Sequence, residues 1–439
     1  MITRDQHPIS RKDIAEPALK VLYRLHNAGY EAYLVGGCVR DLLLGIQPKD
    51  FDVATNAKPE QVQKLFRNCR LVGRRFRLAH IMFGREIIEV ATFRGHHTES
   101  KESEPAQKHS KQDQEGMLLR DNVYGSIDED AQRRDFTVNA LYYNIADFAI
   151  YDFANGVADI EQGVLRMIGD TETRYREDPV RMLRAIRFAT KLSMRLDSTV
   201  AEPIHEHAQL LQNIPPARLF EESLKLFTAG KALANFEMLS DYNLFQQLFP
   251  QLKNYLKAPS EAPYQFLRQT FTDTDTRLAK GLSITPAYLF AALLWWPLQA
   301  RMEELMFESG LPPVDAMNIA AADVIGRQMQ SIAVPKRFTI PAREIWQFQQ
   351  RFERAKGKRV KTLLGHPRFR AAYDFLLLRS ATATPLEQKK LSELAQFWTK
   401  QQEHAPVATA REDERPAAKR RGRRGGRRRK KPDAANKPS

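Results

Sequence analysis

The stretch that decides the fold is Leu34-Val-Gly-Gly-Cys-Val-Arg-Asp-Leu-Leu-Leu-Gly45, followed closely by Lys49-Asp-Phe-Asp-Val-Ala-Thr55. It predicts a strand over Ala32–Val35 that turns at two glycines into a helix over Val39–Leu44. Such a turn offers backbone N–H groups and the positive end of a helix dipole to a phosphate. Glycine allows the close approach, and a following arginine can add a charge-assisted contact. An ordinary strand–helix turn is the alternative; the candidate nucleotide-binding residues are Gly36, Gly37 and Arg40.

Two aspartates follow on the next predicted strand, Phe51–Ala54. Alternate side chains of a strand share a face, so Asp50 and Asp52 point one way and Phe51 points into the core. Their Cα atoms would lie about 6.5 Å apart, and the two carboxylates repel each other unless a cation lies between them. Oxygen ligands of this kind suit Mg²⁺ in phosphoryl chemistry. Asp50 and Asp52 are therefore the candidate metal ligands, with two solvent-facing aspartates at a strand end as the alternative.

A third carboxylate would complete a two-metal site, and the sequence offers two candidates. Glu89 lies on a predicted strand over Ile87–Phe93, and Asp135 follows the pair Arg133-Arg134, which suits a triphosphate or a ribose. Asp135 could instead cap a helix, because a helix is predicted over Ala131–Asn144. The sequence alone leaves both roles open.

A predicted helix over Asp178–Leu192 carries a second group of charges. Asp178 is a candidate N-cap, with Pro179 at the first helical position. Arg181, Arg184 and Arg187 recur every three residues and so share a face. An arginine stripe is often simply solvated, but together with an aspartate it can offer donors and acceptors to the edge of a base.

Strand patterns largely end near Asp170, and long amphipathic helical patterns fill the rest of the 439 residues. We therefore expect an α+β head followed by an all-α remainder and a basic tail. The expected divisions are a flexible N-terminus at 1–12, a catalytic head at 13–170 with a mobile insertion at 97–116, a helical neck and body at 171–260, a helical C-terminal RNA-binding domain at 261–402, and a disordered Arg/Lys-rich tail at 403–439.

The charge is uneven along the chain. The formal net charge is +15, and residues 411–439 carry 13 basic and 4 acidic side chains, a net +9, which leaves +6 for residues 1–410. A basic excess indicates a polyanionic partner. Two cysteines are too few for a disulfide scaffold or a Cys-based zinc site. With no run of about 18 apolar residues and no signal-like N-terminus, we expect no membrane span and a cytoplasmic location.

Four motifs occur in the same order as in the class II nucleotidyltransferases, the family of bacterial poly(A) polymerases and tRNA CCA-adding enzymes. They are Gly36-Gly-x-Val-Arg-Asp41, Asp50-x-Asp52, Arg133-Arg-Asp135 and Glu177-Asp-x-x-Arg-x-x-Arg184. The chain resembles this family. Further segments resemble the poly(A) polymerase branch: Arg70–His80, Pro335-Lys-Arg337 with Ile345-Trp346 beyond it, Phe369–Asp374 and the basic tail.

The resemblance implies a polymerase-β-like nucleotidyltransferase head. It implies that Asp50, Asp52 and Asp135 are the catalytic aspartates and that Glu89 lies close to them. Gly37 and Arg40 match nucleotide-binding positions. The residues that match those reading the incoming base without a nucleic-acid template are Asp178, Arg181 and Arg184.

The implied function is transfer of AMP from ATP to RNA 3′ ends with release of pyrophosphate, using two Mg²⁺ ions and promoting RNA decay. A CCA-adding enzyme, a small-molecule nucleotidyltransferase and a catalytically inactive RNA-binding protein on the same fold are the alternatives. We expect a monomer whose basic tail binds RNA or docks to an RNA-decay protein. The candidate RNA-binding cations are Arg74, Arg75, Arg77, Lys336, Arg337, Arg427, Arg428 and Arg429, of which the first three could equally line a solvated hairpin edge.

Overall fold

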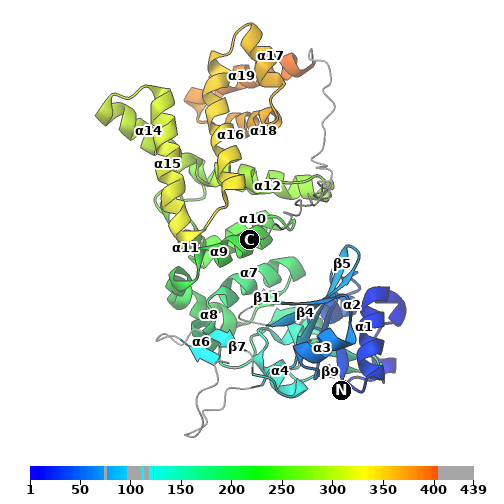
Figure 1. Ribbon diagram of the computed structural model, residues 1–439. Coiled ribbons are helices and arrows are strands. Elements are labelled where there is room, and N and C mark those ends of the chain that lie inside the picture. Colours follow the sequence, from blue (N-terminus) through cyan, green and yellow to red (C-terminus); the bar gives the residue numbers. More distant parts are fainter. Residues whose placement is uncertain (74–76, 96–109, 113–117, 122, 404–439) are drawn as a thin grey trace, which may run out of the picture.

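The computed structural model describes residues 1–73, 77–95, 110–112, 118–121 and 123–403. An α+β head lies at one end, and a succession of packed helices extends away from it, with α17, α18 and α19 at the far end (Figure 1). The expected α+β head on an all-α remainder is confirmed. Within the described residues, no helix is long and apolar enough to cross a membrane.

The head is built on a seven-stranded sheet with the order β3-β4-β5-β2-β1-β8-β9. Strands β2 and β5 run parallel, and their register places Asp52 opposite Glu89; the other neighbouring strands are antiparallel. The strands are β1 (Ala32–Val35), β2 (Asp52–Thr55), β3 (Cys69–Val72), β4 (Leu78–Phe83), β5 (Glu86–Thr92), β8 (Leu141–Asn144) and β9 (Ile150–Asp152).

Three helices accompany these strands: α1 (Glu16–Asn27), α2 (Gly37–Leu43) and α3 (Pro59–Leu65). Helix α1 has proline in its first turn, which suits the fixed φ of that residue. Its buried residues Val21, Leu22 and Leu25 follow helical spacing, and the helix packs against β1 and β2. Amphipathic spacing therefore places α1 on the sheet that carries the aspartates.

The helix predicted over Ala131–Asn144 is wrong in its second half. Helix α4 (Ile127–Arg133) ends before Asp135, a short 3₁₀ helix covers Thr137–Asn139, and β8 then pairs with β1. Tyr142 and Tyr143, which point to opposite faces of β8, are both almost fully buried. Two buried faces leave no period-two polar alternation to mark the strand.

The N-terminus also differs from the flexible segment expected at residues 1–12. Ile9 is 1% exposed, and Ile2 forms a β-bridge with Ile150. The Nε2 atom of buried His7 lies 2.9 Å from the carbonyl oxygen of Phe148. These contacts attach the N-terminus to the head. They could not be predicted because most residues of the segment 1–12 are polar and give no helical or strand pattern.

Part of the predicted mobile insertion forms a strand. Strand β6 (Ser110–Gln112) pairs with β7 (Leu118–Asp121) in a separate two-stranded sheet. The rest of the segment 97–116, like residues 404–439 of the tail, lies outside the described residues.

Helices continue from the head to the end of the described chain. A short parallel pair, β10 (Val164–Leu165) with β11 (Arg195–Leu196), joins the two parts. The helices are α5 (Gly156–Gln162), α6 (Thr171–Glu177), α7 (Val180–Leu192), α8 (Ser198–His207), α9 (Pro216–Phe227), α10 (Ala232–Asp241), α11 (Phe245–Leu248), α12 (Ala262–Ala279), α13 (Pro286–Leu293), α14 (Trp295–Ser309), α15 (Pro313–Ser331), α16 (Lys336–Arg354), α17 (Lys358–Leu364), α18 (Phe369–Ala381) and α19 (Pro385–Glu403).

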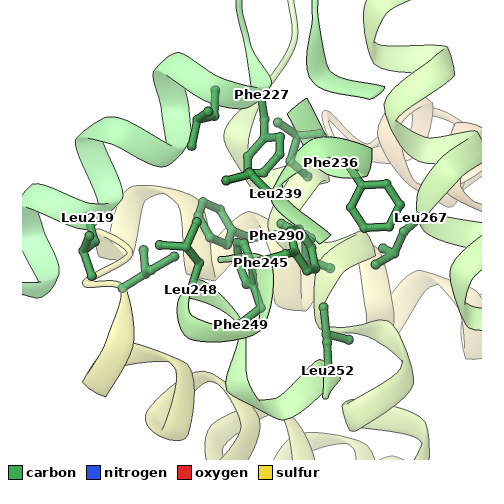
Figure 2. Packing of buried hydrophobic residues seen from close by; sticks show 14 of the residues in the cluster. Leu219, Phe227, Phe236, Leu239, Phe245, Leu248, Phe249, Leu252, Leu267 and Phe290 are labelled. Carbon is green, nitrogen blue, oxygen red and sulfur yellow. The ribbon is translucent and has the colours of Figure 1, made fainter. Parts of the chain in front are cut away.

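The helical part has one long core, and it does not divide at the expected boundary near residue 260. A single cluster joins residues from Phe136 to Leu378, including the phenylalanines between α9 and α13 that Figure 2 shows in contact. Phe236 lies 4.9 Å from Phe245 and 5.0 Å from Phe271 between ring centroids. A second cluster begins at Phe348 and ends at Trp398, so the structural division of the helical part falls within α16.

Candidate active site

The predicted glycine turn is present, and its geometry requires glycine. Gly36 has φ 74° and ψ −127° and precedes α2 directly. A Cβ atom at this position would lie 3.4 Å from both Nη1 of Arg134 and the carbonyl oxygen of Asn139. The positive φ is therefore what requires glycine, and the Arg134 guanidinium lies against the turn at van der Waals distance from the missing Cβ.

Asp52 and its neighbours form the acidic part of the site. Phe51 is 5% exposed and packs inward, whereas Asp50 and Asp52 are exposed, as the alternation predicts. Asp50 lies just before β2, and Glu89 faces Asp52 across the β2–β5 pair. All three carboxylates line one open pocket at this edge of the head.

The pKa of Asp52 reports how these groups act on one another. Desolvation by the surrounding protein raises it, the Glu89 and Asp50 carboxylates add to the increase, and Arg134 opposes them, with a result of about 6. A carboxylate whose ionisation is disfavoured by two like charges gains from a bound cation. The donor set therefore fits Mg²⁺.

Within the described residues, no group of three or more His, Cys, Asp or Glu side chains has the arrangement of a complete metal site. Asp50 and Asp52 would thus hold Mg²⁺ from one side only. Mg²⁺ commonly takes its other ligands from substrate phosphates and water, which suits a site that works on a triphosphate.

The two arginines of the Arg133-Arg134 pair point to different partners. Arg133 donates through Nη1 to the carbonyl oxygen of Gly95. Arg134 donates through Nε to the Tyr142 hydroxyl at 2.8 Å and pairs through Nη2 with Asp130 at 3.0 Å. These contacts hold Arg134 between the glycine turn and Asp52, where a triphosphate would bind.

Arg40, which the sequence predicts as a phosphate-binding residue, is buried and paired with protein groups. Its side chain is 2% exposed and pairs with Asp41 at 2.5 Å, and its Nη1 donates to the Asn139 side chain. Its guanidinium also lies over the Phe188 ring, 5.3 Å from the centroid. Arg40 therefore acts as a support of the glycine turn, because burial and the hydrogen bonds to Asp41 and Asn139 occupy its donors.

Asp135, predicted to act beside Asp50 and Asp52, is not among the residues that line their pocket. One of its oxygens accepts from Arg184 Nε at 2.6 Å and Nη2 at 2.5 Å, and the other from the Phe136 N–H and the Asn139 amide. Burial alone would raise the pKa of Asp135, but the Arg184 charge and these hydrogen bonds lower it to about 2. Asp135 is thus a tether between the head and α7, and Glu89 is the carboxylate placed near Asp52.

The remaining motif residues of the neck are also paired. Asp178 accepts from Arg218 Nη2 at 2.7 Å and from the Val180 N–H at 3.3 Å. The predicted N-cap is wrong by one residue, because Pro179 takes that position and α7 begins at Val180. Arg181 pairs with Glu177 at 2.9 Å. Both motif residues are therefore held by charged partners on neighbouring helices, Asp178 by Arg218 of α9 and Arg181 by Glu177 of α6.

Sequence reasoning missed three residues: Arg174 and Lys191 join the head to the neck, and Arg218 makes a contact within the helical part. Arg174 donates through Nη2 to the carbonyl oxygens of Gln132 and Arg134. Lys191 pairs with Asp41 at 3.4 Å, and Arg218 holds Asp178. Arg174 lies only three residues before Glu177, so its position beside the fourth motif was the available signal.

The candidate RNA-binding cations are spread over the chain. Arg77 pairs with Glu60 at 2.6 Å. Lys336 and Arg337 are exposed at the start of α16, where Arg337 lies over the Phe338 ring. The others lie outside the described residues: Arg74, Arg75, Arg427, Arg428 and Arg429.

Comparison with known proteins matches three consecutive parts of the chain to one family. The Poly A polymerase head domain matches residues 32–166, the "probable RNA and SrmB-binding site of polymerase A" matches 193–256, and the polymerase A arginine-rich C-terminus matches 309–432.

Individual proteins agree with this match. The chain is 56% identical to Poly(A) polymerase I of Salmonella typhi over 92% of this chain and 86% of that one. It is 35% identical to the CCA-adding enzyme of Lactobacillus helveticus over 58% and 62%, respectively. The structure of the Bacillus stearothermophilus CCA-adding enzyme with CTP aligns with a TM-score of 0.56 at 25% identity, covering 87% of this chain and 82% of that one. The chain therefore belongs to the poly(A) polymerase family of nucleotidyltransferases.

Proposed function

We propose that this protein is a template-independent polynucleotide adenylyltransferase that adds AMP from ATP to RNA 3′ ends. The observation that carries the proposal is the pair Asp50 and Asp52, exposed beside the Gly36 turn and facing Glu89 across β2 and β5. Such a pair is arranged to bind Mg²⁺ and a triphosphate together.

In the reaction, the RNA 3′-oxygen attacks the α-phosphorus of ATP. A new P–O bond forms, the bond to the β-phosphate oxygen breaks, the hydroxyl proton is lost, and pyrophosphate leaves. Mg²⁺ at Asp50 and Asp52 would lower the pKa of the attacking hydroxyl and neutralise charge on the leaving group.

The chain's own residues position the reactants. Backbone N–H groups after Gly36 and the guanidinium of Arg134, whose charge acts on Asp52, would meet the triphosphate. Asp178 and Arg181 stand on the neck side, where an acceptor and a donor can be offered to a base edge. The contribution of the protein is orientation and charge more than covalent chemistry.

The test is AMP incorporation into an RNA oligomer by the Asp50→Ala and Asp52→Ala variants. Each should lose at least about 100-fold in activity, because each removes a carboxylate that would hold the Mg²⁺, and losing one preorganised stabiliser of transition-state charge commonly costs that much. Glu303→Ala, which removes an exposed carboxylate on α14, is the matched control and should keep wild-type activity. Near-full activity of both aspartate variants would overturn the proposal.

CCA addition is the second candidate, because both activities share the chemistry. The longer and higher match to Poly(A) polymerase I favours AMP addition over the partial match to the CCA-adding enzyme. Purified protein should extend a tRNA that lacks its 3′ end with ATP but not efficiently with CTP. Efficient CTP addition would reverse the choice.

Two regions are proposed to engage the RNA beyond its 3′ end. Residues 193–256 match the region that the family describes as a probable RNA and SrmB-binding site. The tail at 411–439 carries a net +9. Deleting the tail should weaken RNA binding and flatten its salt dependence, since fewer counterions are released.

A further inference from the structure

A groove between α15, α16 and α17, at the end of the molecule far from the head (Figure 1), is outside the site described so far. Its lining includes buried Met317 and Leu363, which form an apolar floor, and the exposed arginines Arg351, Arg354 and Arg359, which form a cationic rim. The lining contains no carboxylate. An apolar floor beneath a cationic rim is suited to a ligand that has both flat apolar faces and repeated negative charges.

The walls of the groove are fixed to each other by amide contacts. Gln347 on α16 donates to the Asn318 side chain on α15 at 2.9 Å. Gln350 donates to the carbonyl oxygen of Pro313 at 3.0 Å. These contacts hold α15 against α16, so the groove exists before any ligand binds and little ordering entropy is lost on binding.

The groove is surrounded by basic residues that have few acidic neighbours in the sequence. The segment 351–361 contains six Lys or Arg residues and one acid, Glu353, and that acid pairs with Lys390 on α19. In the described part of the chain, Arg354, Lys356, Lys358, Arg359 and Lys361 form no ion pair with a carboxylate, and all five are exposed.

Other exposed arginines nearby do have carboxylate partners. Arg368 pairs with Glu344 at 3.2 Å, and Arg370 pairs with Asp374 at 3.0 Å. Like charges held together without counter-charges repel one another. A cluster of this kind is stabilised when a polyanion covers it.

We infer that the α15–α16–α17 groove, through Arg354 and Arg359, binds the sugar-phosphate backbone of single-stranded RNA upstream of the 3′ end. The inference rests on the proposed function, which supplies the RNA. Single-stranded RNA matches the groove because its phosphates can pair with the arginines while an unpaired base stacks on a guanidinium plane. The carboxylates of an acidic protein segment would match the charge of the arginines but would not stack on their guanidinium planes.

The test compares the full-length protein with the double variant R354A/R359A in binding to a fluorescent single-stranded RNA oligomer from 50 to 200 mM salt. The control, K389A/K400A, removes the same charge from exposed positions on α19 that do not line the groove. For single strands, each lost phosphate contact flattens the slope of log affinity against log salt by about 0.7. The groove variant should flatten it by about 1.4 and the control by much less.

Thermal unfolding of both variants checks that the fold is intact. In a titration of RNA at saturating ATP, the groove variant should reach a wild-type kcat and show a raised KM for RNA, because the groove lies away from the active site. Equal salt slopes for the groove variant and the control would overturn the inference. Loss of binding to polyglutamate with an unchanged RNA slope would also overturn it and assign the groove to an acidic protein. Failure of the proposed function would appear separately, as wild-type protein that does not incorporate AMP.

Discussion

Replacing Asp135 with asparagine should loosen the junction of head and neck while leaving the metal site intact. Asp135 lies on the head, Arg184 lies on α7, and their contacts of 2.5 and 2.6 Å join the two parts. The Asp135 side chain is 10% exposed and that of Arg184 is 31% exposed. Solvent therefore screens this pair much less than an ordinary surface ion pair.

The size of the effect follows from the pKa of Asp135. In the folded protein the pKa is about 2, against 3.8 for an unperturbed aspartate. At 1.36 kcal/mol for each pKa unit, the ionised carboxylate stabilises the folded state by about 2.5 kcal/mol. Because the folded pKa is the lower one, this contribution is complete above about pH 4 and is lost as the pH falls through 2.

The assay is urea unfolding of the wild type, D135N, R184Q and D135N/R184Q at pH 7. The cycle should give a coupling energy of about 1–3 kcal/mol, because the Asn139 and Phe136 hydrogen bonds also lower the pKa of Asp135 while burial raises it. The difference between wild type and D135N should be constant from pH 5 to pH 8 and smaller at pH 3. An exposed-site control, Asp315→Asn on α15, should change the stability by less than about 0.5 kcal/mol.

Two results would refute this reasoning. A coupling energy below about 0.5 kcal/mol would mean that the pair contributes no more than a surface contact. A shift in the Mg²⁺ concentration for half-maximal activity in D135N, comparable to that of D52N, would show that Asp135 acts at the metal site. We expect D135N to keep the wild-type Mg²⁺ dependence.

Three further results are expected. Because the pKa of Asp52 is about 6, the Mg²⁺ affinity should be constant above pH 6 and fall about tenfold per pH unit below it. Mg²⁺ titration from pH 5 to pH 8 measures this, and an unchanged affinity at pH 5 would contradict it. Gly36→Ala, at φ 74° and against Arg134, should raise the KM for ATP about tenfold or more, whereas Gly84→Ala, at φ 64° with open space around it, should not. Phe236→Ala should lower the unfolding free energy by about 3–5 kcal/mol, since Phe236 is fully buried, while Phe397→Ala, at 41% exposure, should cost far less.

The local features of the site could be predicted because short-range signals set them. The Ala32–Val35 strand, the glycine turn and the alternation of Asp50, Phe51 and Asp52 depend only on backbone geometry and period-two burial. Glu89 was one of two candidates for the third carboxylate. The sequence could not choose it because its place beside Asp52 depends on the parallel register of β2 and β5.

The partners of the charged side chains could not be predicted. Arg184 pairs with a carboxylate 49 positions earlier, and Arg40 donates to an amide 99 positions later. Local spacing suggested that Arg40 and Arg184 face a ligand. The spacing of arginines along a helix does not indicate which distant carboxylate or amide the fold will place beside them. The strand β8 was missed for a related reason, because its pairing with β1 overrides the helical pattern of its residues.

These pairings change what the motifs mean for the chemistry. Burying a guanidinium without a partner is costly, so Arg40, Arg181 and Arg184 are each held by a protein carboxylate in this structure. Arg40 and Arg184 form a fixed scaffold that orients the glycine turn and the neck, whereas Arg134 is held with its Nη1 against Gly36 and Arg181 is held by Glu177 on the side proposed to meet the base. A site built in this way stabilises transition-state charge with groups that need little reorganisation when the reaction occurs. The arginines of the motifs therefore divide into those that hold the site in shape and those that meet the nucleotide, and a substitution in the first group should reduce stability as well as activity.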